Sequence, residues 1–155
     1  VGAEAEELGG RGDFARHLDP DLYFPVIVPD TDVAMQGTPS EVEWLPILRE
    51  ASFNLGLRMA LYELAYLNLG TMGGPMALCY LSGKCRYLVF KIVTPDERLS
   101  SAEHCSESLG YKIGNTPSYA APFQKWIWND DNLDVIEREF DEMVRSIDAI
   151  RPPND

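Results

Sequence analysis

The feature that most constrains the fold is an apolar stretch interrupted by small residues, LNLGTMGGPMALCYLSG, which runs from Leu67 to Gly83. A short β-forming run is followed by glycines at positions 70, 73 and 74, by Pro75, and by a second apolar run. Proline suits the first position of a helix because its φ is already helical and its missing N–H would be unpaired there. The pattern predicts a strand, a glycine loop and a helix whose N-cap is Gly74.

The segments on both sides of this stretch are also apolar and patterned. Residues 55–70 (LGLRMALYELAYLNLG) predict an amphipathic helix followed by a short strand at residues 66–69, with Arg58 on the solvent face rather than in a ligand site. Residues 86–93 (RYLVFKIV) predict a central strand that is covered on both faces. The core-facing helix positions would be Leu57, Ala60, Leu61, Leu64 and Ala65.

Two more patterned segments lie nearer the ends of the chain. Residues 22–28 (LYFPVIV) predict a buried strand, and apolar residues at three- and four-residue steps after residue 130 predict a long helix that ends before Pro152. Strands alternating with helices indicate a three-layer, Rossmann-like α/β domain with a mostly parallel sheet over residues 21–150. A flexible acidic tail is expected over residues 1–20 and a short tail over 151–155.

Composition excludes several classes of function. The chain carries 13 basic and 25 acidic residues, a formal net charge of -12, which opposes binding to nucleic acid. Charges and glycines interrupt the most apolar region, so no membrane span is expected. Three cysteines without a CxxC pair indicate a reducing, cytoplasmic location. His17 and His104 lack metal-ligand spacing, and the glycine motifs of NTPases and dinucleotide enzymes are absent, so neither a metal nor a cofactor is expected.

The glycine loop is the best candidate for a binding site. α/β sheets bind ligands at the carboxyl ends of their strands, which is where this loop would lie. Free N–H groups in the first turn of the following helix favour an anion such as phosphate. Alternatively, the glycines only permit a tight, closely packed turn between strand and helix. The candidate binding residues are Thr71, Met72, Gly73, Gly74, Pro75 and Met76.

Lys91 is a further candidate because it interrupts the apolar run LVFKIV. An uncompensated buried ammonium group is costly, so the side chain needs a partner. It would meet a bound phosphate near the strand end, reach solvent, or pair with a carboxylate such as Asp96.

Two other segments have both a functional and a structural interpretation. Asp30 and Asp32 follow the strand predicted at residues 22–28, where they could accept hydrogen bonds from a ribose or simply form a turn. Residues 119–131 (YAAPFQKWIWNDD) are rich in aromatic side chains. They could frame a base or a sugar, or anchor the final helix on the sheet.

The stretch ALYELAYLNLGTMGGPMALCYLSGKCRYLVFKIV, residues 60–93, resembles nucleotide-sugar glycosyltransferases of the glycosyltransferase-B fold, such as the heptosyltransferase-like group. In those proteins a small-residue loop ending in Gly-Pro-Met follows a helix and a short strand. The matching positions are Gly74, Pro75 and Met76. Met72 and Gly73 stand where similar loops usually carry Asp and Ser.

This resemblance implies that the chain is the C-terminal, donor-binding domain of such an enzyme. The loop amides would then hold the diphosphate of a nucleotide sugar, and the reaction would be glycosyl transfer. The general base would come from a missing N-terminal acceptor domain or from a partner chain. The alternative is a non-catalytic module that binds a nucleotide or phosphate, or that serves as an interaction domain.

Overall fold

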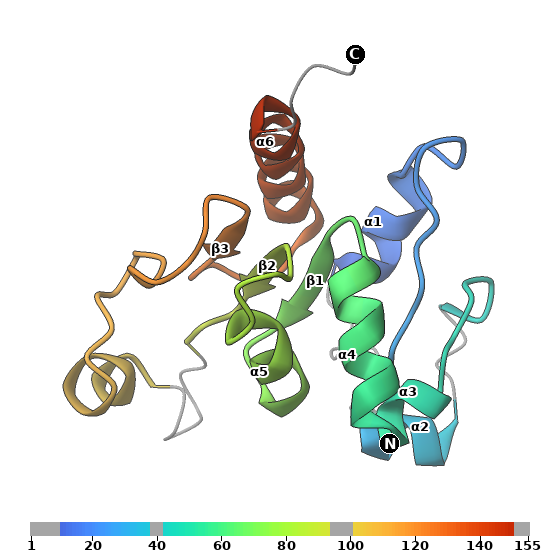
Figure 1. Cartoon of the computed structure of the whole chain (residues 1–155), viewed down its shortest axis with the longest axis horizontal. Helices are drawn as coiled ribbons and strands as arrows, with labels where there is room; N and C mark the ends of the chain where they lie inside the picture. Colours follow the sequence, from blue (N-terminus) through green and yellow to red (C-terminus); the bar gives the residue numbers. More distant parts are fainter. Residues whose placement is uncertain (1–9, 38–41, 94–100, 151–155) are drawn as a thin grey trace.

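The computed structural model describes residues 10–37, 42–93 and 101–150. Helices surround a central, three-stranded, all-parallel sheet, so the fold is mixed α/β, as the alternating sequence pattern predicts (Figure 1). In chain order the elements are α1 (Arg11–His17), α2 (Thr31–Gln36), α3 (Glu50–Phe53), α4 (Leu55–Leu64), β1 (Asn68–Thr71), α5 (Gly74–Tyr80), β2 (Tyr87–Phe90), the π-helical turn η3 (His104–Ser108), β3 (Gln124–Trp126) and α6 (Leu133–Ile150).

The sheet has the order β1-β2-β3, with Tyr87 of β2 opposite Asn68 on one side and Gln124 on the other. All four residues of β2 are fully buried, which confirms the central strand predicted within residues 86–93. The sequence analysis did not predict β3, which lies inside the aromatic segment 119–131. Because all three strands are parallel, their carboxyl ends meet at one edge of the sheet.

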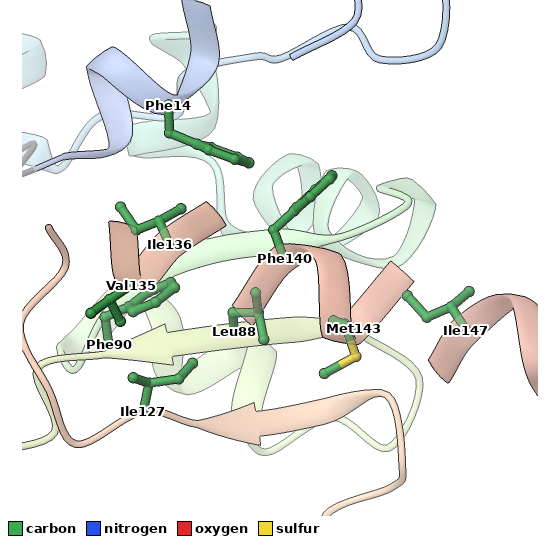
Figure 2. Close-up of a cluster of buried hydrophobic side chains, with 9 residues drawn as sticks. All are labelled: Phe14, Leu88, Phe90, Ile127, Val135, Ile136, Phe140, Met143 and Ile147. Carbon is green, nitrogen blue, oxygen red and sulfur yellow. The ribbon is translucent and has the colours of Figure 1, made fainter. Parts of the chain in front are cut away.

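The first face of the sheet carries Leu88 and Phe90 of β2. These side chains pack against the apolar stripe of α6 and against Phe14 of α1, whose ring lies edge-on to that of Phe140 at 5.0 Å between centroids (Figure 2). The stripe confirms the helix predicted after residue 130. The buried members of this cluster are Phe14, Leu88, Phe90, Ile127, Val135, Ile136, Phe140, Met143 and Ile147.

The opposite face carries Tyr87 and Val89 and is covered by Met76 and Cys79 of α5. Trp126 of β3 completes this face of the core. Three further aromatic rings surround Trp126, with centroid distances of 5.8 Å to Tyr80, 4.8 Å to Tyr111 and 6.3 Å to Trp128. Apolar packing on both faces therefore fixes β2, and with it the carboxyl edge of the sheet.

Two predictions before β1 are wrong. Residues 22–28 form no strand: Ile27 makes an isolated bridge with Ile47, and Phe24 is 79% exposed. Pro25 and Pro29 lack the N–H groups that a strand needs on this segment. The helix α4 forms as expected, but it buries Arg58 and leaves Leu64 84% exposed. The inward face of α4 therefore carries Arg58 and Tyr62, which belongs to the core, and not the predicted stripe.

The N-terminal segment contains more structure than a tail. Helix α1 begins at Arg11, inside the tail predicted over residues 1–20, and it buries Phe14. Residues 1–9 and 151–155 lie outside the described residues, so the first part of the tail predicted over residues 1–20 and the whole tail over 151–155 stay predictions. Of the helices in the described ranges, none combines the length and the apolar character needed to span a membrane.

Candidate functional site at the carboxyl edge of the sheet

The loop between β1 and α5 is short. Strand β1 ends at Thr71 and α5 begins at Gly74, so the N-cap is Gly73, one residue earlier than predicted. Gly73 has φ -177°, an extended conformation that any residue can adopt. The Met72 N–H donates to the Phe90 carbonyl oxygen at 3.1 Å, which extends the pairing with β2 and removes this amide from the set of free donors.

Three donors remain after Met72. The N–H groups of Gly73, Gly74 and Met76 donate no hydrogen bond within the described part of the chain. Gly73 and Gly74 are exposed, whereas Met76 is buried. A Cβ added at Gly74 would meet no heavy atom within 4 Å. The backbone at Gly73 and Gly74 is therefore open to a ligand.

Gly70, in contrast, is a packing glycine. A Cβ at this position would lie 2.6 Å from Cγ and 2.7 Å from Sδ of Met76, because the Met76 side chain folds back over β1. The packing interpretation of the glycines thus holds for Gly70. Gly73 and Gly74 have no such contact, so packing does not explain them.

Lys91 follows β2 directly and leaves the sheet next to Met72. Its φ of +50° lies in the left-handed region, which is uncommon for a residue with a side chain and occurs most often where the surroundings or a function require it. Its N–H donates to the Asn129 carbonyl oxygen at 3.2 Å. Its Nζ lies 3.4 Å from Oδ1 of Asp131. Asp96, the partner considered from sequence, lies outside the described residues.

Asp131 is the buried centre of this charge cluster, with only 3% of its surface exposed. Besides Lys91, it faces Arg11 of α1, whose Nε lies 3.2 Å from Oδ2. Its carbonyl oxygen accepts a 2.7 Å hydrogen bond from the Gly10 N–H. Asp131 therefore lies between two cations, Lys91 and Arg11.

Arg58 and Asp30, which the sequence also raised as candidate ligand contacts, lie outside the charge cluster around Asp131. Arg58 is 2% exposed and donates to the carbonyl oxygens of Ala51 and Pro29, while Asp30 lies 3.9 Å from its Nη1. Arg58 and Asp30 thus contact each other, and the segment before α2 is attached to α4. The expectation of a solvent-facing Arg58 is wrong.

The aromatic segment 119–131 has a structural role. It contains β3, and Trp126 belongs to the buried core. The Trp128 Nε1–H donates to the Asn115 carbonyl oxygen at 3.0 Å. Tyr119 is 55% exposed. These contacts anchor the segment on the sheet, as one of the two interpretations expects.

The described residues also bear on metal binding and thiol chemistry. Within the described ranges, His, Cys, Asp and Glu side chains form no group of three or more that could hold a metal ion. Cys79, Cys85 and Cys105 are free and buried. Burial, and then the neighbouring Cys85, raise the pKa of the Cys79 thiol, which disfavours the reactive thiolate.

Sequence reasoning missed Asp131 and Arg11 as members of the site. The missing step was β3: had QKWIW been identified as a strand, Asp131 would have been placed at the same sheet edge as Lys91. No comparable signal marks Arg11. The exposed backbone donors of Gly73 and Gly74, with Lys91 after the neighbouring strand, favour an anionic ligand. Comparisons with protein-family models, with curated proteins and with solved structures find no match to this chain.

Proposed function

We propose that this domain binds the diphosphate of a nucleotide sugar at the carboxyl edge of its sheet, as the donor-binding part of a glycosyltransferase. The observation that supports the proposal best is the exposed pair Gly73 and Gly74, whose N–H groups have no partner among the described residues. Lys91 leaves the adjacent strand at the same edge. The proposal includes the finer description of the fold as a three-layer, Rossmann-like donor domain.

In glycosyl transfer this chain would only have to stabilise the negative charge on the departing diphosphate. In glycosyl transfer the bond between the sugar and the diphosphate breaks, and negative charge grows on the departing diphosphate. Backbone donors and a cation that are already in place stabilise such charge without reorganisation. The amides of Gly73 and Gly74, together with Lys91, would do this, and the acceptor and general base would come from another domain or a partner chain.

Binding without catalysis is the second candidate, and one observation favours it. Among the residues that the structure describes, Asp131 is the carboxylate that pairs with the Lys91 ammonium group, and it is buried between two cations. Burial keeps an acceptor hydroxyl from reaching this carboxylate. Asp131 is therefore unsuited to remove a proton from an acceptor hydroxyl.

Isothermal titration calorimetry with UDP, GDP and ADP, each with and without an attached sugar, tests the proposal. The variant Gly74→Asp places a carboxylate beside the proposed phosphate and should abolish binding. Gly83→Asp is the matched control, because Gly83 lies beyond the other end of α5 and a Cβ there also meets nothing within 4 Å. It adds the same charge and should leave the affinity unchanged.

Three results separate the candidates. Binding that Gly74→Asp abolishes and Gly83→Asp preserves supports the anion site. Release of the nucleoside diphosphate in the presence of a sugar acceptor identifies the transferase. If neither nucleotides nor sugar nucleotides bind at millimolar concentration, the proposed function is wrong.

A further inference from the structure

A hollow of about 520 Å³ lies between α1, α6 and the segment that follows α1. Its volume falls within the range of roughly 300–1,000 Å³ that is typical of small-molecule sites. None of its lining residues belongs to the glycine loop or to the charge cluster around Asp131. The hollow is therefore separate from the site of the proposed function, which makes no use of it.

The floor of the hollow is aromatic and is fixed by the core. Its rings are those of Phe14, Tyr23 and Phe140. The Phe140 ring lies edge-on to the other two, at 5.0 Å from Phe14 and 5.3 Å from Tyr23 between centroids, and Figure 2 shows the first of these pairs. Phe14 and Phe140 also belong to the buried cluster on the sheet. Rings that are held in this way offer an apolar surface that needs no ordering when a ligand binds.

The two helical walls of the hollow are held together at two places. At the start of α1, the Gly10 N–H donates to the Asp131 carbonyl oxygen at 2.7 Å. At its end, His17 Nδ1 lies 2.7 Å from Oε1 of Glu137, and both of these side chains line the hollow. The hollow is therefore preformed by contacts within the chain.

The charged groups that line the hollow are mostly carboxylates. Asp19, Glu137 and Asp141 face a single guanidinium group, that of Arg145. Glu137 is already paired with His17. The Asp141 side chain, in contrast, forms no ion pair with any residue that the structure describes. Carboxylates attract a cation, and so do the negative faces of aromatic rings.

We propose that this hollow binds a small organic cation with an apolar body, of the class of the aralkylamines. The apolar body packs against the rings of the floor, and the ammonium group faces Asp19 and Asp141. A neutral ligand of the same shape gains the apolar contacts alone, and an anion is repelled by the carboxylates. The proposal does not depend on the proposed function.

Titration of the full chain at low salt with three ligands of the same apolar body tests the choice of a cation. Phenethylamine is positively charged, phenethyl alcohol is neutral and hydrocinnamate is negatively charged. The amine should bind about fivefold more tightly than the alcohol, and the acid more weakly than either. Two-dimensional NMR should show that the amine shifts the amide signals of α1 and of residues 137–145 together.

Two substitutions on α6 separate the hollow from the general negative charge of the chain. Asp141→Asn removes one lining charge, and it should weaken amine binding about threefold while leaving the affinity for the alcohol unchanged. Asp148→Asn is the matched control: it removes the same charge at an exposed position of the same helix, outside the hollow, and should have little effect. Equal effects of the two substitutions would overturn the proposal.

Val144→Phe tests the hollow itself. Val144 lines it and is half-buried, so the larger side chain fills part of the space, and binding of both the amine and the alcohol should be lost. Thermal unfolding checks that the variant folds; if it does not, the pair on α6 decides. The proposal is also overturned if the alcohol or the acid binds as tightly as the amine, or if the amine shows no saturable binding at millimolar concentration. None of these results bears on nucleotide binding at the glycine loop.

Discussion

Arg58 Nη2 donates a 2.7 Å hydrogen bond to the carbonyl oxygen of Pro29, and this bond attaches α4 to the segment before α2. A second bond, 2.9 Å long, runs from Nε to the Ala51 carbonyl oxygen. The guanidinium group is 2% exposed, so both carbonyl groups are bound by a donor that water cannot easily replace. The helical region before the sheet is thus held by a polar contact.

We expect Arg58→Met to lower the free energy of unfolding by about 3 kcal/mol, because it removes two charge-assisted hydrogen bonds and leaves the Ala51 carbonyl oxygen without a donor, whereas the Pro29 carbonyl oxygen keeps the Ser52 hydroxyl at 2.7 Å. Urea unfolding followed by circular dichroism measures the change. Lys84→Met is the control: Lys84 is 78% exposed, so the same kind of substitution should change stability by less than about 0.5 kcal/mol. Equal effects of the two substitutions would contradict the structural role of Arg58.

Gly70→Ala should destabilise the protein by about 1–3 kcal/mol, because the added methyl group overlaps Cγ and Sδ of Met76. Gly83→Ala adds the same methyl group in open space and should be nearly neutral. In a chain that already carries Met76→Ala, the penalty of Gly70→Ala should largely disappear. Thermal unfolding of the original chain, Gly70→Ala, Met76→Ala and the double variant gives the coupling energy between the two positions. Additive effects would show that the methyl group at position 70 and the Met76 side chain do not compete for the same space.

The amide group of Gln124 is satisfied on both sides. Its Nε2 donates to the carbonyl oxygens of Ser82, at 2.7 Å, and Cys85, at 2.8 Å, while its Oε1 accepts from the Ala121 N–H at 2.9 Å. Gln124→Glu would point a carboxylate oxygen at two carbonyl oxygens. We expect a loss of about 3 kcal/mol at pH 7.

This loss should depend on pH in a defined direction. Burial raises the pKa of a carboxyl group at position 124 above its unfolded value of about 4.3, so the variant loses stability as the pH rises above that value. Urea unfolding at pH 4.5 and at pH 7 should show a smaller deficit at the lower pH. Gln36→Glu is the control at an exposed site, and its effect should stay small at both pH values.

Alkaline pH should unfold the protein through its tyrosines. Burial raises the pKa of Tyr87, and burial together with Tyr111 raises the pKa of Tyr119 to about 12. Unfolded tyrosine ionises near pH 10. The contribution of these tyrosines to the free energy of unfolding is therefore fully present below that pH, and it is lost as the pH rises toward the folded pKa values. For the fully buried Tyr87 the slope is at most about 1.4 kcal/mol per pH unit.

Tyr87→Phe tests this dependence, because it removes one of the groups responsible. Urea unfolding at pH 9 and at pH 11 should show a smaller loss for the variant than for the original chain. An identical loss in both proteins would mean that Tyr87 does not drive the alkaline transition.

The central part of the fold could be predicted from sequence because its apolar pattern is continuous. Strand β2 and helix α6 follow from hydrophobicity alone, since β2 is buried on both faces and α6 on one stripe. The position of α5 follows from Pro75, to within one residue. In these elements local preference and burial point to the same structure.

Other parts could not be predicted because tertiary contacts override the local pattern. Strand β3 has only three residues, and it is recognisable as a strand only once β2 is there to pair with it. The orientation of α4 depends on carbonyl groups of distant segments that bind Arg58, and no periodicity encodes those. At the candidate site, the glycine loop and Lys91 carry a sequence signal, whereas the role of Arg11 exists only in the folded chain.

The strand order described above has a kinetic consequence. Tyr87 and Gln124 lie about twice as far apart along the chain as Asn68 and Tyr87, so closing the second ladder carries an additional loop-closure entropy of about 0.6 kcal/mol. Strand β3 has only three residues whose pairing can offset this entropy. The β2–β3 ladder should therefore form last and open first. Native-state hydrogen exchange should therefore reach the Ile127 amide, which donates to the Val89 carbonyl oxygen, before the Asn68 and Met72 amides, which join β1 to the β2 segment.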